Sequence, residues 1–322
     1  MADNRFGTLV GEGGTATQLD QGLWIIDLGF KTREGVIGSF LLAGDDEVAL
    51  IETGPATTLP ALRAGIRAAG FAPADVSKVL VTHIHIDHAG ASGVLARENP
   101  DLKVFVHPLG APHLIDPTKL LISAGRIYGD RMEELWGEVP PVPADQVVPL
   151  ADGETLSVAG RPIAAIFTPG HATHHVAFWN PDTGALFTGD AAGVRMPGTD
   201  LVAATVPPPD LDREAWIEST RRMQDLHPRR IYPTHFGAFD DAEAHLAQII
   251  PNLDEALAVA KDVLESGAGN DELTRRLHEL MASRLGDVPE DVLINLEWAT
   301  PSYMSTLGLT RFLEKGPPRA RG

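Results

Sequence analysis

The chain has 322 residues and a formal net charge of −18, and 43% of its residues are hydrophobic. This length and apolar share suffice for one large or two modest globular cores. The chain contains no cysteine, which excludes disulfides, thiolate catalysis and cysteine–zinc sites. The acidic charge disfavours nucleic acid as a ligand, because it repels phosphate backbones.

Apolar segments long enough for a membrane or a leader are not expected. Residues 1–5 precede no apolar stretch of signal-peptide length. The most apolar runs, 36–43 and 48–51, have strand length and fall short of the roughly 20 residues needed to cross a bilayer. We therefore expect a cytoplasmic protein with no membrane partner.

The first third of the chain predicts strands followed by alternating helices and strands. Apolar runs separated by turn residues predict strands at 23–28, 36–43, 48–51, 78–81 and 104–106. Helical spacing predicts helices over 58–69, which Gly70 ends, and over 91–98. Residues 108–143 mix helix-like stretches with Pro and Gly, and we interpret them as a helical insertion that could act as a lid.

Sequence patterns typical of strands resume after the insertion and end near residue 240. Strands are expected at 147–148, 155–158, 162–167, 176–179, 185–187 and 230–232, with a helix over 213–226. Helical sequence is expected over 241–266, interrupted at Asn252, and over 270–284 after the stretch 267–269, with two shorter helices to follow. The pattern predicts an α/β catalytic domain over 1–240, with two facing sheets and outer helices, and a helical C-terminal extension over 241–322.

The strongest chemical signal is Thr-His-Ile-His-Ile-Asp-His over residues 82–88. It directly follows the predicted strand 78–81. Four potential ligands fall within six residues, and we expect an irregular loop there to turn them toward a metal. Imidazole and carboxylate groups suit zinc, iron or manganese. These four residues are His83, His85, Asp87 and His88.

Three further ligand types stand just beyond predicted strands. His171 follows Phe-Thr-Pro-Gly, Asp190 follows Leu-Phe-Thr-Gly, and His235 follows Ile-Tyr-Pro-Thr. Strand ends are where α/β and sandwich folds tend to place their sites. We therefore predict that these three residues join the 82–88 cluster in one metal centre.

These four motifs, in this order and spacing, resemble the metallo-β-lactamase-fold hydrolase superfamily, in particular its glyoxalase II-like and lactonase-like branch. The match runs from about residue 20 to 240. It implies an αββα sandwich with the site at one edge of the two sheets. It also implies two divalent metal ions, with Asp190 bridging both. The remaining ligands would be His83, His85 and His171 on the first ion, and Asp87, His88 and His235 on the second.

The resemblance implies a hydrolase in which a metal-bridging hydroxide attacks a thioester, a lactone or a related carboxylic ester. Asp190 and Asp87 would be the catalytic carboxylates, with Asp87 also steering the water. Zinc is the first expectation, and manganese and iron are alternatives. The substrate would be a small molecule. A β-lactamase role is disfavoured, because Asp190 stands where antibiotic-hydrolysing branches use cysteine or other substitutions.

Further residues are expected around the ligands. His175, four residues after His171, would support the site by hydrogen bonding. Tyr128 in the insertion would contact the substrate, as a tyrosine does in lactonase relatives. One departure is Glu52-Thr53-Gly54, because the family commonly has Asp before Thr-Gly. His245 stands apart from the motifs and is expected to face solvent or to cap a helix.

Other functions stay open at this point. A mononuclear iron persulfide dioxygenase would bind one ion through His83, His171 and Asp190. A phosphodiesterase is disfavoured by the acidic charge, and a non-enzymatic metal-binding protein by the number of ligands present. The apolar segment 292–313 would dock either on its own body or on a second copy, which makes a homodimer one expectation.

Overall fold

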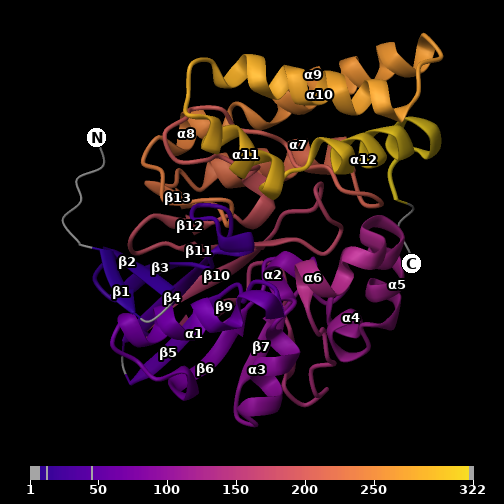
Figure 1. The fold of residues 1–322 in the computed structure, drawn as a ribbon. Coiled ribbons are helices and arrows are strands. Elements are labelled where there is room, and N and C mark those ends of the chain that lie inside the picture. The colour runs from indigo at the N-terminus through magenta and orange to yellow at the C-terminus, as the bar shows by residue number, and fades with distance from the viewer. Residues whose placement is uncertain (1–7, 12–13, 45, 319–322) are drawn as a thin grey trace. The chain divides into compact units, whose positions relative to one another are not determined.

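The computed structural model describes residues 8–11, 14–44 and 46–318 (Figure 1). Residues 1–5, on which the expected absence of a leader depends, lie outside that part. The chain forms two compact units. One is Met1–Ile166 with Phe178–Thr183, and the other is Phe167–Ala177 with Gly184–Gly322. The domain boundary predicted at residue 240 divides strand-containing sequence from helical sequence, whereas the compact units change over between residues 166 and 184. These are different divisions of the chain, so the predicted boundary stays a prediction.

An eight-stranded sheet belongs to the first unit, with its strands in chain order from β1 to β8. The strands are β1 (Thr8–Gly11), β2 (Gly14–Asp20), β3 (Leu23–Asp27), β4 (Gly38–Gly44), β5 (Glu47–Ile51), β6 (Val76–Leu80), β7 (Lys103–Val106) and β8 (Val147–Pro149). Pairing is antiparallel from β1 to β5 and parallel from β5 to β8. The inner strands are apolar and buried, as parallel strands covered on both faces require.

Strands β1 and β2 were not predicted from the sequence. The sequence of β2, Gly-Thr-Ala-Thr-Gln-Leu-Asp, contains no apolar run. Of its residues 15–20, only Ala16 is buried. A strand with so little apolar surface leaves no clear periodic signal, and its pairing with β3 is what makes it a strand.

The helices of the first unit lie between its strands. They are α1 (Leu59–Ala68), α2 (Ile86–Ala89), α3 (Ser92–Glu98), α4 (Ala111–Ile115), α5 (Thr118–Tyr128) and α6 (Met132–Trp136). Helix α1 packs against β1, β2 and β3. The last three helices make up the insertion predicted at 108–143, and its helical content is confirmed.

A second sheet of five strands has the order β13-β12-β11-β10-β9. Its strands are β9 (Thr155–Val158), β10 (Arg161–Phe167), β11 (Val176–Asn180), β12 (Ala185–Phe187) and β13 (Arg230–Tyr232). Strands β9 and β10 pair antiparallel, and β12 pairs parallel with β13. The ends of β10, β12 and β13 lead into the segments that carry His171, Asp190 and His235.

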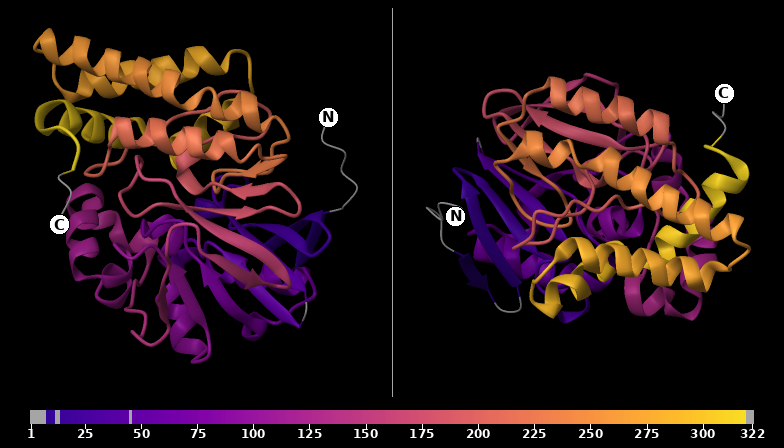
Figure 2. Two further views of the ribbon diagram at one scale, coloured as in Figure 1. Left: turned by 180° about the vertical axis from the view of Figure 1, so that it is seen from behind. Right: turned by 90° about the horizontal axis from the view of Figure 1, so that it is seen from above.

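The second unit is rich in helices, which form the orange-to-yellow layer in Figures 1 and 2. They are α7 (Arg213–Asp225), α8 (Ala242–Leu246), α9 (Ile249–Glu265), α10 (Asn270–Leu285), α11 (Glu290–Ala299) and α12 (Ser302–Lys315). Helix α12 packs against α9 and α10, so part of the apolar segment 292–313 docks on its own body. Among the described residues, no helix is both long and apolar enough to cross a membrane.

Residues 241–266 are largely helical as predicted, but the break expected at Asn252 lies instead at residues 247–248, between α8 and α9. Pro251 lies in the first turn of α9. It has no N–H to donate to the carbonyl of Ala247, and its ring would clash with that carbonyl in a continuous helix. Two helices, α8 and α9, therefore lie on either side of this turn.

Candidate metal centre

The 82–88 motif begins as irregular backbone after β6 and then enters α2. The expectation of an irregular loop throughout was therefore wrong, since Asp87 and His88 lie on a helical turn. His83 and His88 are fully buried, and Asp87 is half-buried. The backbone N–H groups of Thr53 and Gly54 donate to the His88 carbonyl over 2.8 and 3.1 Å, which ties α2 to the turn after β5.

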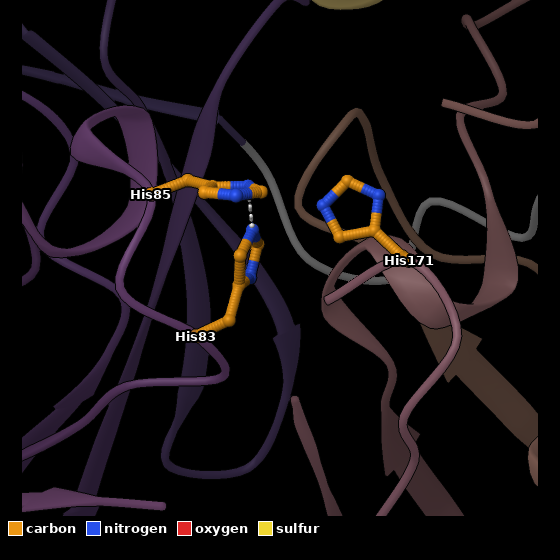
Figure 3. A group of neighbouring side chains, drawn as sticks. All are labelled: His83, His85 and His171. Carbon is orange, nitrogen blue, oxygen red and sulfur yellow. Dashed lines mark hydrogen bonds between the residues drawn. The ribbon is translucent and has the colours of Figure 1, made fainter. Parts of the chain in front are cut away.

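Within this motif the predicted ligands approach one another in pairs. Nε2 of His83 and Nδ1 of His85 share a hydrogen bond of 2.8 Å, drawn in Figure 3. Nε2 of His88 lies 3.7 Å from Oδ2 of Asp87. Three imidazoles and one carboxylate thus come from one short segment of the first unit, as the sequence predicted.

A buried carboxylate, Glu52, organises the rings of this motif. Its Oε1 accepts hydrogen bonds from the Thr82 hydroxyl and from Nδ1 of His88, the latter over 3.0 Å. Its Oε2 accepts from the Thr82 backbone N–H over 3.3 Å. Because the Thr82 hydroxyl donates to Glu52, it accepts from Nδ1 of His83 over 3.0 Å.

This network selects one tautomer for two histidines. His83 and His88 each donate the Nδ1–H of the ring within this network. The lone pair of each ring is therefore on Nε2, and this tautomer can bind a metal through Nε2. Glu52, His83 and His88 also lie close enough to form an ion site by themselves. However, the Glu52 oxygens already accept three hydrogen bonds. Orienting ligands is therefore the role that the geometry of Glu52 favours.

His171 in the second unit stands on a turn that only glycine allows. Gly170 has φ +142°, and a Cβ built there would lie 2.4 Å from Cβ of Trp216 on α7. The close approach of α7 thus fixes the Thr-Pro-Gly-His turn. Nδ1 of His171 donates to the Thr205 carbonyl over 2.8 Å, which again leaves Nε2 with the lone pair.

Asp190 lies in the 3₁₀ turn η5 (Gly189–Ala192), and its two oxygens face two different histidines. Oδ2 lies 3.5 Å from Nε2 of His171, and Oδ1 lies 3.7 Å from Nε2 of His235. All three residues are at most 3% exposed. Two donors held by one zinc ion in tetrahedral geometry are about 3.3–3.6 Å apart. The 3.5 Å separation lies within this range and the 3.7 Å separation just above it, so the donor set fits a carboxylate that would contribute one oxygen to each of two ions.

The two residues expected around the ligands differ in their surroundings. His175 is buried, accepts a hydrogen bond at Nε2 from the Asp190 backbone N–H over 3.1 Å and donates from Nδ1 to Thr168 over 2.8 Å. Tyr128 is half-buried on α5 in the first unit, with its ring edge-on to Trp136 at 5.0 Å. Its contact with a substrate stays a prediction.

Sequence reasoning was wrong about His245. It is 0% exposed, and its Nε2 donates to the Ala192 carbonyl over 2.9 Å. Burial lowers its pKa to about 4, so the ring is neutral near pH 7. The surrounding sequence, Ala-Glu-Ala-His-Leu, gives no sign that this side of a short helix faces inward.

Residues 33–235 match the family model of the metallo-beta-lactamase superfamily, which is more than half of the chain. The chain belongs to the metallo-β-lactamase superfamily. A metallo-beta-lactamase family protein from Thermus thermophilus has a similar structure, with a TM-score of 0.67 and 25% identity over 92% of this chain and 95% of that one. The predicted α/β fold of this superfamily is thus confirmed. At 92% coverage, the likeness extends into the C-terminal helices.

Two curated relatives are 31% identical to this chain. One is an atrochrysone carboxyl ACP thioesterase of Aspergillus fumigatus, matched over 54% of this chain and 43% of that protein. The other is a metallo-beta-lactamase fold-containing protein of Sulfurisphaera tokodaii, matched over 53% of this chain and 66% of that protein. The chain therefore spans less than half of the first relative and about two thirds of the second.

Proposed function

We propose that this protein is a binuclear metal-dependent hydrolase that cleaves a thioester, a lactone or a related carboxylic ester. The observation that carries the proposal is the placement of Asp190, whose oxygens face His171 and His235 at 3.5 and 3.7 Å. A carboxylate with one histidine at each oxygen is suited to bridging two ions. Membership of a superfamily of metallo-hydrolases supports the same conclusion.

The proposed ligands come from the four motifs of the sequence. The first ion would be held by His83, His85 and His171, and the second by Asp87, His88 and His235, with Asp190 shared. The order and spacing of the four motifs in the sequence support this assignment. Zinc suits a set dominated by imidazole nitrogen, and manganese and iron accept the same ligands.

The two ions, when bound, supply a water nucleophile that is active near neutral pH and polarise the carbonyl of the substrate. The protein contributes fixed ligand geometry. Hydrogen bonds at Nδ1 hold the rings of His83, His88 and His171. Asp87, whose side chain is 24% exposed, is the carboxylate that would orient the attacking water and accept its proton.

A thioester is the first substrate class to test. The 31% identical relative from Aspergillus fumigatus is named a thioesterase, which supports this choice. The net charge of −18 favours a small-molecule substrate over nucleic acid. A cytoplasmic location, the lack of a membrane partner and a homodimer remain predictions.

The test is proton release at constant pH from zinc-loaded protein given S-lactoylglutathione, acyl-homoserine lactones, aryl esters and a phosphodiester. We expect rapid hydrolysis of one carbonyl substrate and a loss of at least about 100-fold in Asp190→Asn, because the bridging carboxylate is removed. Asp225→Asn, an exposed position at the end of α7, is the matched control and should retain activity.

Two results would contradict the proposal. Hydrolysis of the phosphodiester alone would identify a phosphodiesterase. No proton release from any substrate, together with oxygen uptake by iron-loaded protein given glutathione persulfide, would identify the dioxygenase alternative.

A further inference from the structure

The ligands Asp190 and His235 lie on two segments that follow neighbouring strands of the second unit. Asp190 is in the turn η5 after β12, and His235 is in the loop after β13. The separation of Oδ1 and Nε2, 3.7 Å, depends on how firmly these segments are held. Neither segment is part of a long helix or strand, so other parts of the unit must hold them.

The turn that carries Asp190 is held through two consecutive carbonyls. Nε2 of His245 on α8 donates to Ala192 O over 2.9 Å, and Nε1 of Trp216 on α7 donates to Ala191 O over 2.7 Å. Both donors are 0% exposed. Hydrogen bonds in such dry surroundings are strong, and a buried carbonyl left without its donor is costly.

The loop that carries His235 is held by Arg195. The Arg195 backbone N–H donates to the His235 carbonyl over 2.8 Å, and its carbonyl accepts from the Phe236 N–H over 3.2 Å. The side chain of Arg195 is 7% exposed. Its Nη1 donates to both oxygens of Asp241 over 2.8 and 2.9 Å, and its Cζ lies 4.3 Å from the ring centre of Phe239.

Both connections end at the start of the helical C-terminal segment. Asp241 immediately precedes α8, and His245 lies in its second turn, where its N–H donates to the Asp241 carbonyl over 2.9 Å. One short helix therefore reaches both ligand-bearing segments. A charge-assisted Arg–carboxylate pair and a buried N–H to a carbonyl are directional contacts, which fix positions better than apolar packing does.

We infer that α8, through Asp241 and His245, is a positioning element of the metal centre, and that the helical C-terminal segment is needed for tight metal binding. This inference rests on the proposed function. Asp241 would act through Arg195 on His235 and hence on the second ion. His245 would act on the Asp190 turn and hence on both ions. Both residues would act through the ligand-bearing segments and not on the substrate.

The first test compares Asp241→Asn with Asp254→Asn in metal-free full-length protein titrated with zinc against a chromophoric chelator. Asp254 on α9 is a stringent control, because both of its oxygens likewise accept from one arginine, here from Nε and Nη2 of Arg213, and because it is 43% exposed against 48% for Asp241. We expect Asp241→Asn to weaken the more loosely bound ion about 10- to 100-fold, and Asp254→Asn to leave both affinities within about twofold.

The second test compares His245→Leu with His245→Gln in the same titration. Leucine removes the donor to Ala192, whereas the glutamine amide keeps an N–H. We expect Leu to weaken both ions and Gln to restore most of the affinity. Thermal unfolding of the metal-free variants shows whether a change in affinity is only a loss of fold.

The inference is overturned if the wild type binds two ions and hydrolyses its substrate, yet Asp241→Asn matches Asp254→Asn and His245→Leu matches the wild type in metal affinity. A wild type that binds no pair of ions would overturn the proposed function itself. The two failures are therefore distinguishable.

Discussion

Glu52 is the residue whose surroundings say most about the metal ligands. It stands at φ +69°, a region that non-glycine residues rarely occupy and that costs roughly 1–3 kcal/mol. From there its carboxylate reaches His88 directly and His83 through Thr82. A strained backbone held in place by three hydrogen bonds indicates that orienting these rings matters to the site.

Replacing Glu52 with Gln should therefore weaken metal binding. The amide has nearly the same shape but carries no charge, and if its oxygen keeps the Thr82 hydroxyl and Nδ1 of His88, its NH2 group faces the Thr82 backbone N–H, which loses its acceptor. We expect zinc affinity to fall about 10- to 100-fold, measured by competition with a chelator. Glu47→Gln, on β5 in the same sheet and partly exposed in an ion pair with Lys78, should leave the affinity unchanged. Equal affinities in the two variants would refute the role of Glu52.

The candidate ligands were predictable from sequence, but their hydrogen-bond partners were not. Each candidate ligand is a residue of a metal-binding type that follows a strand, and this pattern can be recognised in the amino-acid sequence. The partner of His171 is the backbone carbonyl of Thr205, 34 residues away. Any residue offers such a carbonyl, so only the fold identifies it. Glu52 was noticed as a departure from a motif, yet its contact with His88 could not be read from the sequence.

At the scale of elements, the prediction succeeded where apolar periodicity was strong. Strands such as β5 and β12 and the helix α7 lie within a few residues of their predicted ranges. It failed at β2, which is too polar to show a pattern, and at the division between α8 and α9, which lies at residues 247–248 and not at Asn252. The second failure matters most, because the separate helix α8 is the element that reaches Asp190 and His235.

The packing of α7 against the turn of His171 gives a prediction at this scale. In Gly170→Ala, a methyl group would stand 2.4 Å from Cβ of Trp216 at φ +142°. The helix or the turn must then move, and we expect a loss of at least about 2 kcal/mol of stability together with weaker metal binding. Gly125→Ala, in open space on α5, should instead raise stability by roughly 0.5–1 kcal/mol. Thermal unfolding of both variants measures this, and similar shifts would refute the packing argument.

Across the whole molecule, each unit contains a buried histidine that stays neutral in the folded state. Burial lowers the pKa of His107 in the first unit and of His245 in the second to about 4. In the unfolded chain a histidine titrates near 6.5. Below that pH the unfolded state binds protons that the folded state excludes. The stability from these groups is therefore fully present above about pH 6.5 and is lost as the pH falls toward 4.

Asp27 acts in the opposite direction, because burial raises its pKa to about 6. Its folded form takes up a proton between about pH 6 and 4, before the unfolded form does, so acidification through this range stabilises the fold. A shift of about two pKa units corresponds to on the order of 3 kcal/mol, similar to the loss expected from His245. Two histidines against one aspartate leave a net loss of stability on acidification. Denaturant unfolding at pH 7 and pH 4.5 should show a smaller loss in His245→Gln than in the wild type and a larger loss in Asp27→Asn. The same loss in all three proteins would mean that these groups do not set the acid stability.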